Sequence, residues 1–189
     1  MRVAILLLAV AGAQAALAAP TRGPWTVGLA LRPELAAEGA GLGTQASFRY
    51  RFTPTFSLDS VGRSTLSWGR AGGEDELYAA LGVGVGFELG DDLEAWSPRA
   101  ALRLTHIHHA TLESWGDTPY ANAAGDSSGG VRHRSGFEGA VGLVAPTLTP
   151  LWGQALRWEL ELSAGLLPSS EHFAWMTALV IGLSLDATR

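Results

Sequence analysis

The chain of 189 residues contains no cysteine and no lysine. Without cysteine, neither a disulfide framework nor a thiolate metal site can form. All 13 basic residues are arginine, a bias that high genomic GC content alone can produce, and no cationic block of the kind that binds nucleic acid is present. Charged residues make up only 16% of the chain, whereas the surface of a soluble protein carries about a quarter to a third. This shortage indicates that much of the exterior does not face water.

The chain also lacks an apolar run long enough for a transmembrane helix, which needs about 20 residues. Its longest N-terminal run, residues 3–11, follows the cationic Met1-Arg2 and precedes two small-x-small sites, AQA at 13–15 and ALA at 16–18. This pattern is typical of a cleaved secretory signal peptide. We therefore expect residues 1–18 to be removed on export to the periplasm and residues 19–189 to form one domain.

The stretch LYAALGVGVGFEL at 77–89 alternates large apolar residues with small or polar ones, and this period of two predicts a strand. Several of the eight segments with this pattern are 10 residues or longer, which suits strands that cross a bilayer at a tilt. The sequence predicts an all-β fold, an eight-stranded antiparallel up-and-down transmembrane β-barrel. The predicted strands are residues 25–31, 42–52, 56–68, 77–89, 96–109, 131–144, 156–166 and 173–185.

Alternation alone is compatible with a soluble lipocalin-like barrel, whose Gly-x-Trp start is mimicked by GPW at 23–25. Two observations favour an apolar face that points to lipid. The opposite face is rich in glycine, as at Gly82, Gly84 and Gly86, and glycine is depleted on solvated strands. Aromatic residues also gather near both strand ends, as at Phe52 and Trp68, where membrane barrels carry their interfacial girdles.

The polar face would then fill the barrel lumen, which in an eight-stranded barrel has room only for its own side chains. Buried charges persist when they are paired, so we predict a lumen plugged by ion pairs, with glycines leaving space for the arginine stems. The expected register sets Arg49 opposite Asp59 and Glu88 opposite Arg99. Eight arginines would face five carboxylates, so any leak would prefer anions. The predicted lumen residues are Arg49, Arg51, Asp59, Arg63, Glu88, Arg99, Arg103, Arg132, Arg134, Glu138, Arg157, Glu159 and Glu161.

The long connections follow the odd-numbered strands, so with both termini in the periplasm they would face the cell exterior. The longest is 110–130. We expect the acidic side chains of these loops to be solvated. The acidic loop residues are Glu34, Glu38, Glu74, Asp75, Glu76, Glu113, Asp117, Asp126 and Glu171.

On its signal peptide, strand count, loop alternation and charged lumen, the chain resembles the small eight-stranded outer-membrane barrels of the OmpA/OmpX type over residues 19–189. The resemblance implies a monomer in the outer membrane with a structural or surface-interaction role. It implies outer-membrane lipid, lipopolysaccharide and the barrel-assembly machinery as partners, with no nucleic acid and no cofactor. Such barrels commonly end in an aromatic residue, whereas this chain ends LSLDATR, so recognition would rely on Leu183 and Leu185.

Histidines are concentrated in THIHHATLES at 105–114. His106 and His108 share the outward face of their strand, and His133 of the next strand shares it too. Three imidazoles can bind zinc, but interfacial residues that touch lipid headgroups need the same placement. No metal site is predicted from the sequence, and this cluster remains a hypothesis.

The same run is similar to the lipid A deacylase barrels, in which a strand carries His-x-Ser-Asn-Ala and a later glutamate completes a triad. Here His106 and Ala110 match, but His108 and His109 replace the serine and the asparagine. Ser135 lies near His133 on the same face and would be the substitute nucleophile in such an enzyme, but no obvious orienting acid is in phase. We therefore expect no catalytic residues, and a lipid A-modifying enzyme and a narrow anion-preferring channel remain alternatives.

Overall fold

The protein is described from a computed structural model, which covers residues 21–37, 39–69, 75–111, 132–168 and 173–188. The predicted signal peptide and nearly all of the 110–130 loop lie outside these ranges. Among the described residues, no helix is long and apolar enough to cross a membrane.

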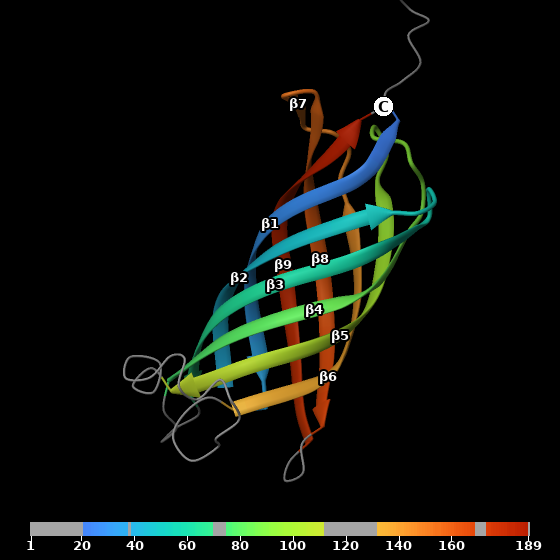
Figure 1. Cartoon of the computed structure of the whole chain (residues 1–189). Coiled ribbons are helices and arrows are strands. Elements are labelled where there is room, and N and C mark those ends of the chain that lie inside the picture. The colour runs from blue at the N-terminus through green and yellow to red at the C-terminus, as the bar shows by residue number, and fades with distance from the viewer. Residues whose placement is uncertain (1–20, 38, 70–74, 112–131, 169–172, 189) are drawn as a thin grey trace, which may run out of the picture.

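The described chain forms one antiparallel sheet that closes on itself (Figure 1). Each long strand pairs with the next, and the first strand pairs with the last to complete the barrel. The predicted eight-stranded barrel is confirmed. The strands are β1 Arg22–Ala36, β2 Gly39–Arg51, β3 Phe56–Gly69, β4 Glu76–Glu88, β5 Ser97–Thr111, β6 Arg132–Val144, β7 Thr149–Leu151, β8 Gln154–Pro168 and β9 Phe173–Thr188.

The short strand β7 is an addition to the eight predicted strands. It lies in the connection between β6 and β8 and pairs only with β8. Trp152 and Gly153 form the turn between β7 and β8, and both have positive φ, 51° and 73°. Two-residue hairpin turns of this kind match the twist of the strands, but they usually carry Asn-Gly or Asp-Gly. β7 was not predicted because a three-residue strand is too short to show alternation and Trp-Gly is not a usual hairpin turn sequence.

β1 is longer than predicted and corrects the assignment of Glu34. The strand continues beyond Leu31 to Ala36, so Arg32 and Glu34 point into the barrel and Leu35 points out. Glu34 is buried, and its carboxylate lies 3.1 Å from Nε of Arg32. Its expected place in a solvated loop is wrong, because the alternation of the strand continues past Pro33 and the buried carboxylate has a guanidinium partner.

The barrel is apolar outside and charged inside. Leu104 is 62% exposed, whereas its neighbour Arg103 is 1% exposed. Leu81, Val83 and Leu160 likewise lie on the outside. In water this polarity would be strongly unfavourable, since burial of apolar surface drives the folding of soluble proteins. It is the polarity that a lipid environment requires.

Exposed aromatic side chains lie near both ends of the barrel. We name the end where β1 begins and β9 finishes the near end, and the opposite end the far end (Figure 1). Phe52, Phe56 and Trp96 are exposed around the near end, and Trp68 and Trp175 are exposed at the far end. This distribution matches the two aromatic girdles predicted from the sequence.

The interior is not charged throughout. At the far end, Tyr78, Ile107, Leu167 and Met176 form a buried apolar cluster. At the near end, Leu93 of the β4–β5 connection is buried, and the Thr147 amide donates a hydrogen bond to its carbonyl over 2.8 Å. Packed groups therefore lie at both ends of the charged lumen.

The glycines of β4 have two different roles. A Cβ added to Gly82 would lie 2.9 Å from Val61 and 3.6 Å from Cδ of Arg103, so this glycine leaves space for lumen side chains as expected. A Cβ on Gly84 would instead overlap the carbonyl oxygen of Leu102 in the β5 backbone. Gly84 therefore allows the close approach of two strands that a narrow barrel imposes.

We predict that Gly84→Ala destabilises the barrel and Gly62→Ala does not. The added methyl group at Gly84 meets backbone that cannot move aside, and overpacking of this kind costs about 1–3 kcal/mol or more. Nothing lies within 4 Å of a Cβ placed on Gly62. The free energy of unfolding in lipid vesicles, measured by urea titration and by heat-modifiable gel migration, tests both variants. Equal stability of the two would contradict this role of Gly84.

Candidate functional site

The predicted cross-strand register is confirmed at both positions. Arg49 of β2 lies opposite Asp59 of β3, and Glu88 of β4 lies opposite Arg99 of β5. The first follows from the tight β2–β3 turn, in which the Phe52 amide donates to the Phe56 carbonyl. A short turn leaves a hairpin little freedom of register.

The ion pairs do not follow this register. Arg49 contacts Glu159 of β8 and lies 3.7 Å from Glu88 of β4, rather than contacting Asp59. Arg99 contacts Asp59 at 2.6 Å and Glu161 at 2.8 Å. In a closed narrow barrel the inward side chains converge on the axis, so the tips of long side chains meet across the lumen. Arg49 and Asp59, and likewise Glu88 and Arg99, face each other on adjacent strands without forming an ion pair with each other. Arg103 and Glu138 are also directly opposite each other, and they do form an ion pair at 2.8 Å.

Arg103 and Glu138 form the centre of the lumen network. The Arg103 guanidinium donates to Glu138 at 2.8 Å and to both carboxylate oxygens of Glu161 at 2.9 Å. Glu138 also accepts from Arg63, and from Arg32 at 3.3 Å. Arg103 and Glu138 are each 1% exposed. Planar guanidinium groups suit such shared contacts because they present five donors in a fixed geometry.

A second group of charges surrounds Asp186 near the near end. Its carboxylate lies 3.3 Å from Arg22, 3.1 Å from Arg51 and 3.3 Å from Arg157. The predicted last strand ended at residue 185 and therefore left Asp186 in a tail beyond it. β9 instead continues to Thr188, and the signal was present, because Ser184 and Asp186 continue the inward phase.

Four lumen residues were missed because the first and last predicted strands were too short, namely Arg22, Arg32, Glu34 and Asp186. With them, the ion pairs among described residues join eight arginines to seven carboxylates. Arg134 also lies on the inward face of β6, so arginines still outnumber carboxylates and the expected anion preference of any leak stays a prediction. The arginines are Arg22, Arg32, Arg49, Arg51, Arg63, Arg99, Arg103 and Arg157, and the carboxylates are Glu34, Asp59, Glu88, Glu138, Glu159, Glu161 and Asp186.

The other predicted residues lie near strand ends or outside the described part of the chain. Arg134 lies half-buried on the inward face of β6, and the side chain of Arg132 is not described. Asp75 is exposed and Glu76 is half-buried at the start of β4. The remaining acidic loop residues, Glu38, Glu74, Glu113, Asp117, Asp126 and Glu171, lie outside the described residues.

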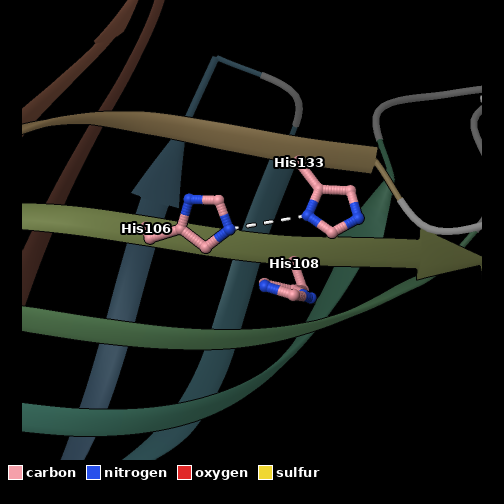
Figure 2. Close-up of side chains that lie close together, drawn as sticks. All are labelled: His106, His108 and His133. Atoms are coloured by element: carbon pink, nitrogen blue, oxygen red, sulfur yellow. Dashed lines mark hydrogen bonds between the residues drawn. The ribbon is translucent and has the colours of Figure 1, made fainter. Parts of the chain in front are cut away.

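The histidine cluster lies on the outer face of β5 and β6, close to the far end (Figure 2). His106 and His108 are two residues apart on β5, and His133 of β6 lies directly opposite His108. The three rings are in contact, with centroids 4.3 Å apart for His108 and His133 and 4.7 Å apart for His106 and His108. One ring nitrogen from each residue lies within 4.8 Å of the others.

Ser135 joins this cluster through His106. The Oγ atom of Ser135 lies 2.7 Å from Nδ1 of His106, and Nε2 of the same ring lies 3.5 Å from Nδ1 of His133. A groove beside these groups is lined by Leu81, Leu104 and Phe137 among others. The site therefore places polar side chains next to apolar surface that faces lipid.

No protein-family model and no curated protein matches the chain. Similarity to solved structures shows the fold of this chain. Neisserial surface protein A (NspA) is 13% identical with a TM-score of 0.60, and the match covers 86% of this chain and 96% of NspA. Ail, the attachment invasion locus protein of Yersinia pestis, is 12% identical with a TM-score of 0.52 over 87% of this chain and 99% of Ail.

The N-terminal β-barrel domain of Pseudomonas aeruginosa OprF is also similar, at 12% identity and a TM-score of 0.50 over 84% of this chain and 96% of that domain. The chain therefore has the fold of the small eight-stranded outer-membrane barrels.

We predict that Glu138→Gln lowers the free energy of unfolding by about 3–5 kcal/mol, because removal of one partner leaves buried charge uncompensated. Glu94→Gln is the matched control, since Glu94 is exposed in the β4–β5 connection, and its stability should stay within about 0.5 kcal/mol of the native value. Urea unfolding in lipid vesicles measures both. Unchanged stability of Glu138→Gln would show that the carboxylate is not essential to the network.

Proposed function

We propose that this protein is a monomeric integral outer-membrane barrel with a plugged, non-conducting lumen and a structural or surface-interaction role. In this proposal residues 1–18 direct export and are removed, and the barrel-assembly machinery inserts the domain among outer-membrane lipid and lipopolysaccharide. The long connections, including 110–130, then face the cell exterior. The continuous network of lumen ion pairs is the observation that carries the proposal.

The apolar exterior supports the membrane location. Exposed leucine, valine and phenylalanine side chains cover the strands between the two aromatic girdles, and only a lipid phase makes such a surface favourable. The fold similarity to outer-membrane barrels is consistent with this location.

The lumen contacts support a structural role rather than transport. An open channel needs a water-filled path past its side chains, whereas Arg103, Glu138 and Asp59 are each 1% exposed. Their ion pairs link β3, β5, β6 and β8 across the barrel axis. The apolar cluster of Tyr78, Ile107, Leu167 and Met176 adds a second barrier at the far end.

We predict that the refolded protein gives no steady single-channel conductance in planar lipid bilayers at neutral pH. The described lumen charges are buried in ion pairs, so ions would have to displace them in order to cross. Heat-modifiable migration of the same sample verifies that the barrel is folded, and an open porin in the same bilayers provides the positive control. Regular conductance steps with anion selectivity would support the narrow-channel alternative instead.

A second candidate function, hydrolysis of acyl esters in membrane lipid, is favoured by the contact between Ser135 and His106. In this function Ser135 Oγ attacks the ester carbonyl, its proton passes to Nδ1 of His106 and then to the departing alcohol, and water hydrolyses the acyl-serine. His133 would take the orienting position that an acid holds in most triads. The groove lined by Leu81, Leu104 and Phe137 would receive an acyl chain.

For this second candidate, expression in a Gram-negative host should remove an acyl chain from lipid A, as seen in its mass spectrum. Ser135→Ala and His106→Ala should abolish the change, because they remove the nucleophile and the base. His108→Ala should retain it, since no contact joins His108 to Ser135. An unchanged lipid A mass with the native protein would exclude this activity.

A further inference from the structure

From their arrangement we infer that His106, His108 and His133 form a binding site for one borderline divalent cation, with Zn²⁺ as the principal ligand. The site lies on the outer surface near the far end of the barrel. It does not depend on whether the lumen conducts ions or on any role of the loops.

The strand geometry brings the three imidazoles together without help from flexible loops. His106 and His108 point the same way because they are two residues apart on β5. His133 lies directly opposite His108, a position at which Cβ atoms of antiparallel strands are about 4.5–5.5 Å apart. All three histidines lie within the paired part of β5 and β6, so the sheet backbone sets their relative positions.

The nitrogen spacing fits a tetrahedral cation. Two nitrogens bound to zinc at about 2.0–2.1 Å lie about 3.4 Å apart in a tetrahedron. Nε2 of His106 and Nδ1 of His133 are 3.5 Å apart, and all three ligand atoms lie within 4.8 Å of one another (Figure 2). Rotation of the His108 side chain would bring one of its ring nitrogens to the third ligand position. The fourth position would be taken by water.

Ser135 supplies the outer contact that a metal-bound histidine usually has. A histidine ligand normally donates its other ring N–H to a hydrogen-bond acceptor, which sets the tautomer and the ring orientation. Ser135 Oγ lies 2.7 Å from Nδ1 of His106. When Nδ1–H donates to this oxygen, Nε2 carries the lone pair and faces His133.

Chemistry selects the class of cation. Among the described residues, the site offers nitrogen ligands and no carboxylate, which suits Zn²⁺, Cu²⁺ and Ni²⁺, whereas Mg²⁺ and Ca²⁺ prefer oxygen. A bound cation would also exclude the hydrolase function while it is present, because that function needs Nδ1 of His106 as a proton acceptor.

Isothermal titration of tag-free, detergent-refolded protein with ZnCl₂ at pH 7.5 tests the site. We expect one Zn²⁺ per barrel with a Kd at or below about 10 μM, and no binding of MgCl₂ or CaCl₂. His108→Gln and His133→Gln should each weaken binding at least tenfold, and the triple Gln variant should abolish it. Heat-modifiable migration should remain native in all of them, because these side chains point away from the lumen.

Two further variants separate the site from its surroundings. Leu81 lies opposite His106 in the β4–β5 register, and the Leu81→Ala variant should bind zinc with unchanged affinity. Ser135→Ala should keep the 1:1 stoichiometry with about 10- to 100-fold weaker binding, the usual effect of losing an outer contact, although it removes the nucleophile of the second candidate function. No zinc binding by the native protein, or unchanged binding by the triple variant, would overturn the inference and leave the histidines as interfacial residues that contact headgroups.

Discussion

The constraint on which the structure depends is the pairing of buried arginine with buried carboxylate inside a narrow barrel. An isolated buried charge costs several kcal/mol, and Coulomb attraction repays this cost only when each ion has close, well-oriented partners. Glu138 has three guanidinium partners and Asp186 also has three. Each ion therefore depends on residues from several strands, so the network is complete only when the barrel is closed.

The same constraint explains why small residues line the inner face. Arginine stems occupy most of the available volume, so the residues that face them must be small, as at Gly82. Strand curvature adds a separate demand at Gly84, where the backbone of β5 leaves no space for a Cβ. The apolar exterior is the counterpart of this interior, because a chain that places its charges inside must find an apolar solvent outside.

The histidine cluster is the exception to this separation of polar and apolar faces. Its three rings and Ser135 lie on the outward face next to leucine and phenylalanine. Polar groups in such a place need partners, and the contacts from His106 to Ser135 and to His133 supply them. This local network is independent of the lumen, since its side chains point to the opposite side of the sheet.

The alternation of residue types was sufficient to predict the eight long strands, and the tight β2–β3 turn gave the register of that hairpin. Their polarity followed only when the glycines of one face and the aromatic residues near the strand ends were considered as well. Each of these features depends on neighbours along the chain or across one short turn. Strand ends were predicted less well, and Glu34 and Asp186 were lost from the lumen because alternation gives no clear stop beside proline or near a terminus. Arg103 and Glu138 pair directly across neighbouring strands, but for many of the other charges the tertiary structure decided which ones meet. Arg49 faces Asp59 across a hairpin but pairs with Glu159 of β8, because closure of the barrel brings distant strands within reach of a long side chain. Closure of the barrel likewise brought Gly84 close to the β5 backbone. Strand pairing and the side-chain rotamers brought Ser135 next to His106. Neither contact distance can be read from the spacing of residues along the chain.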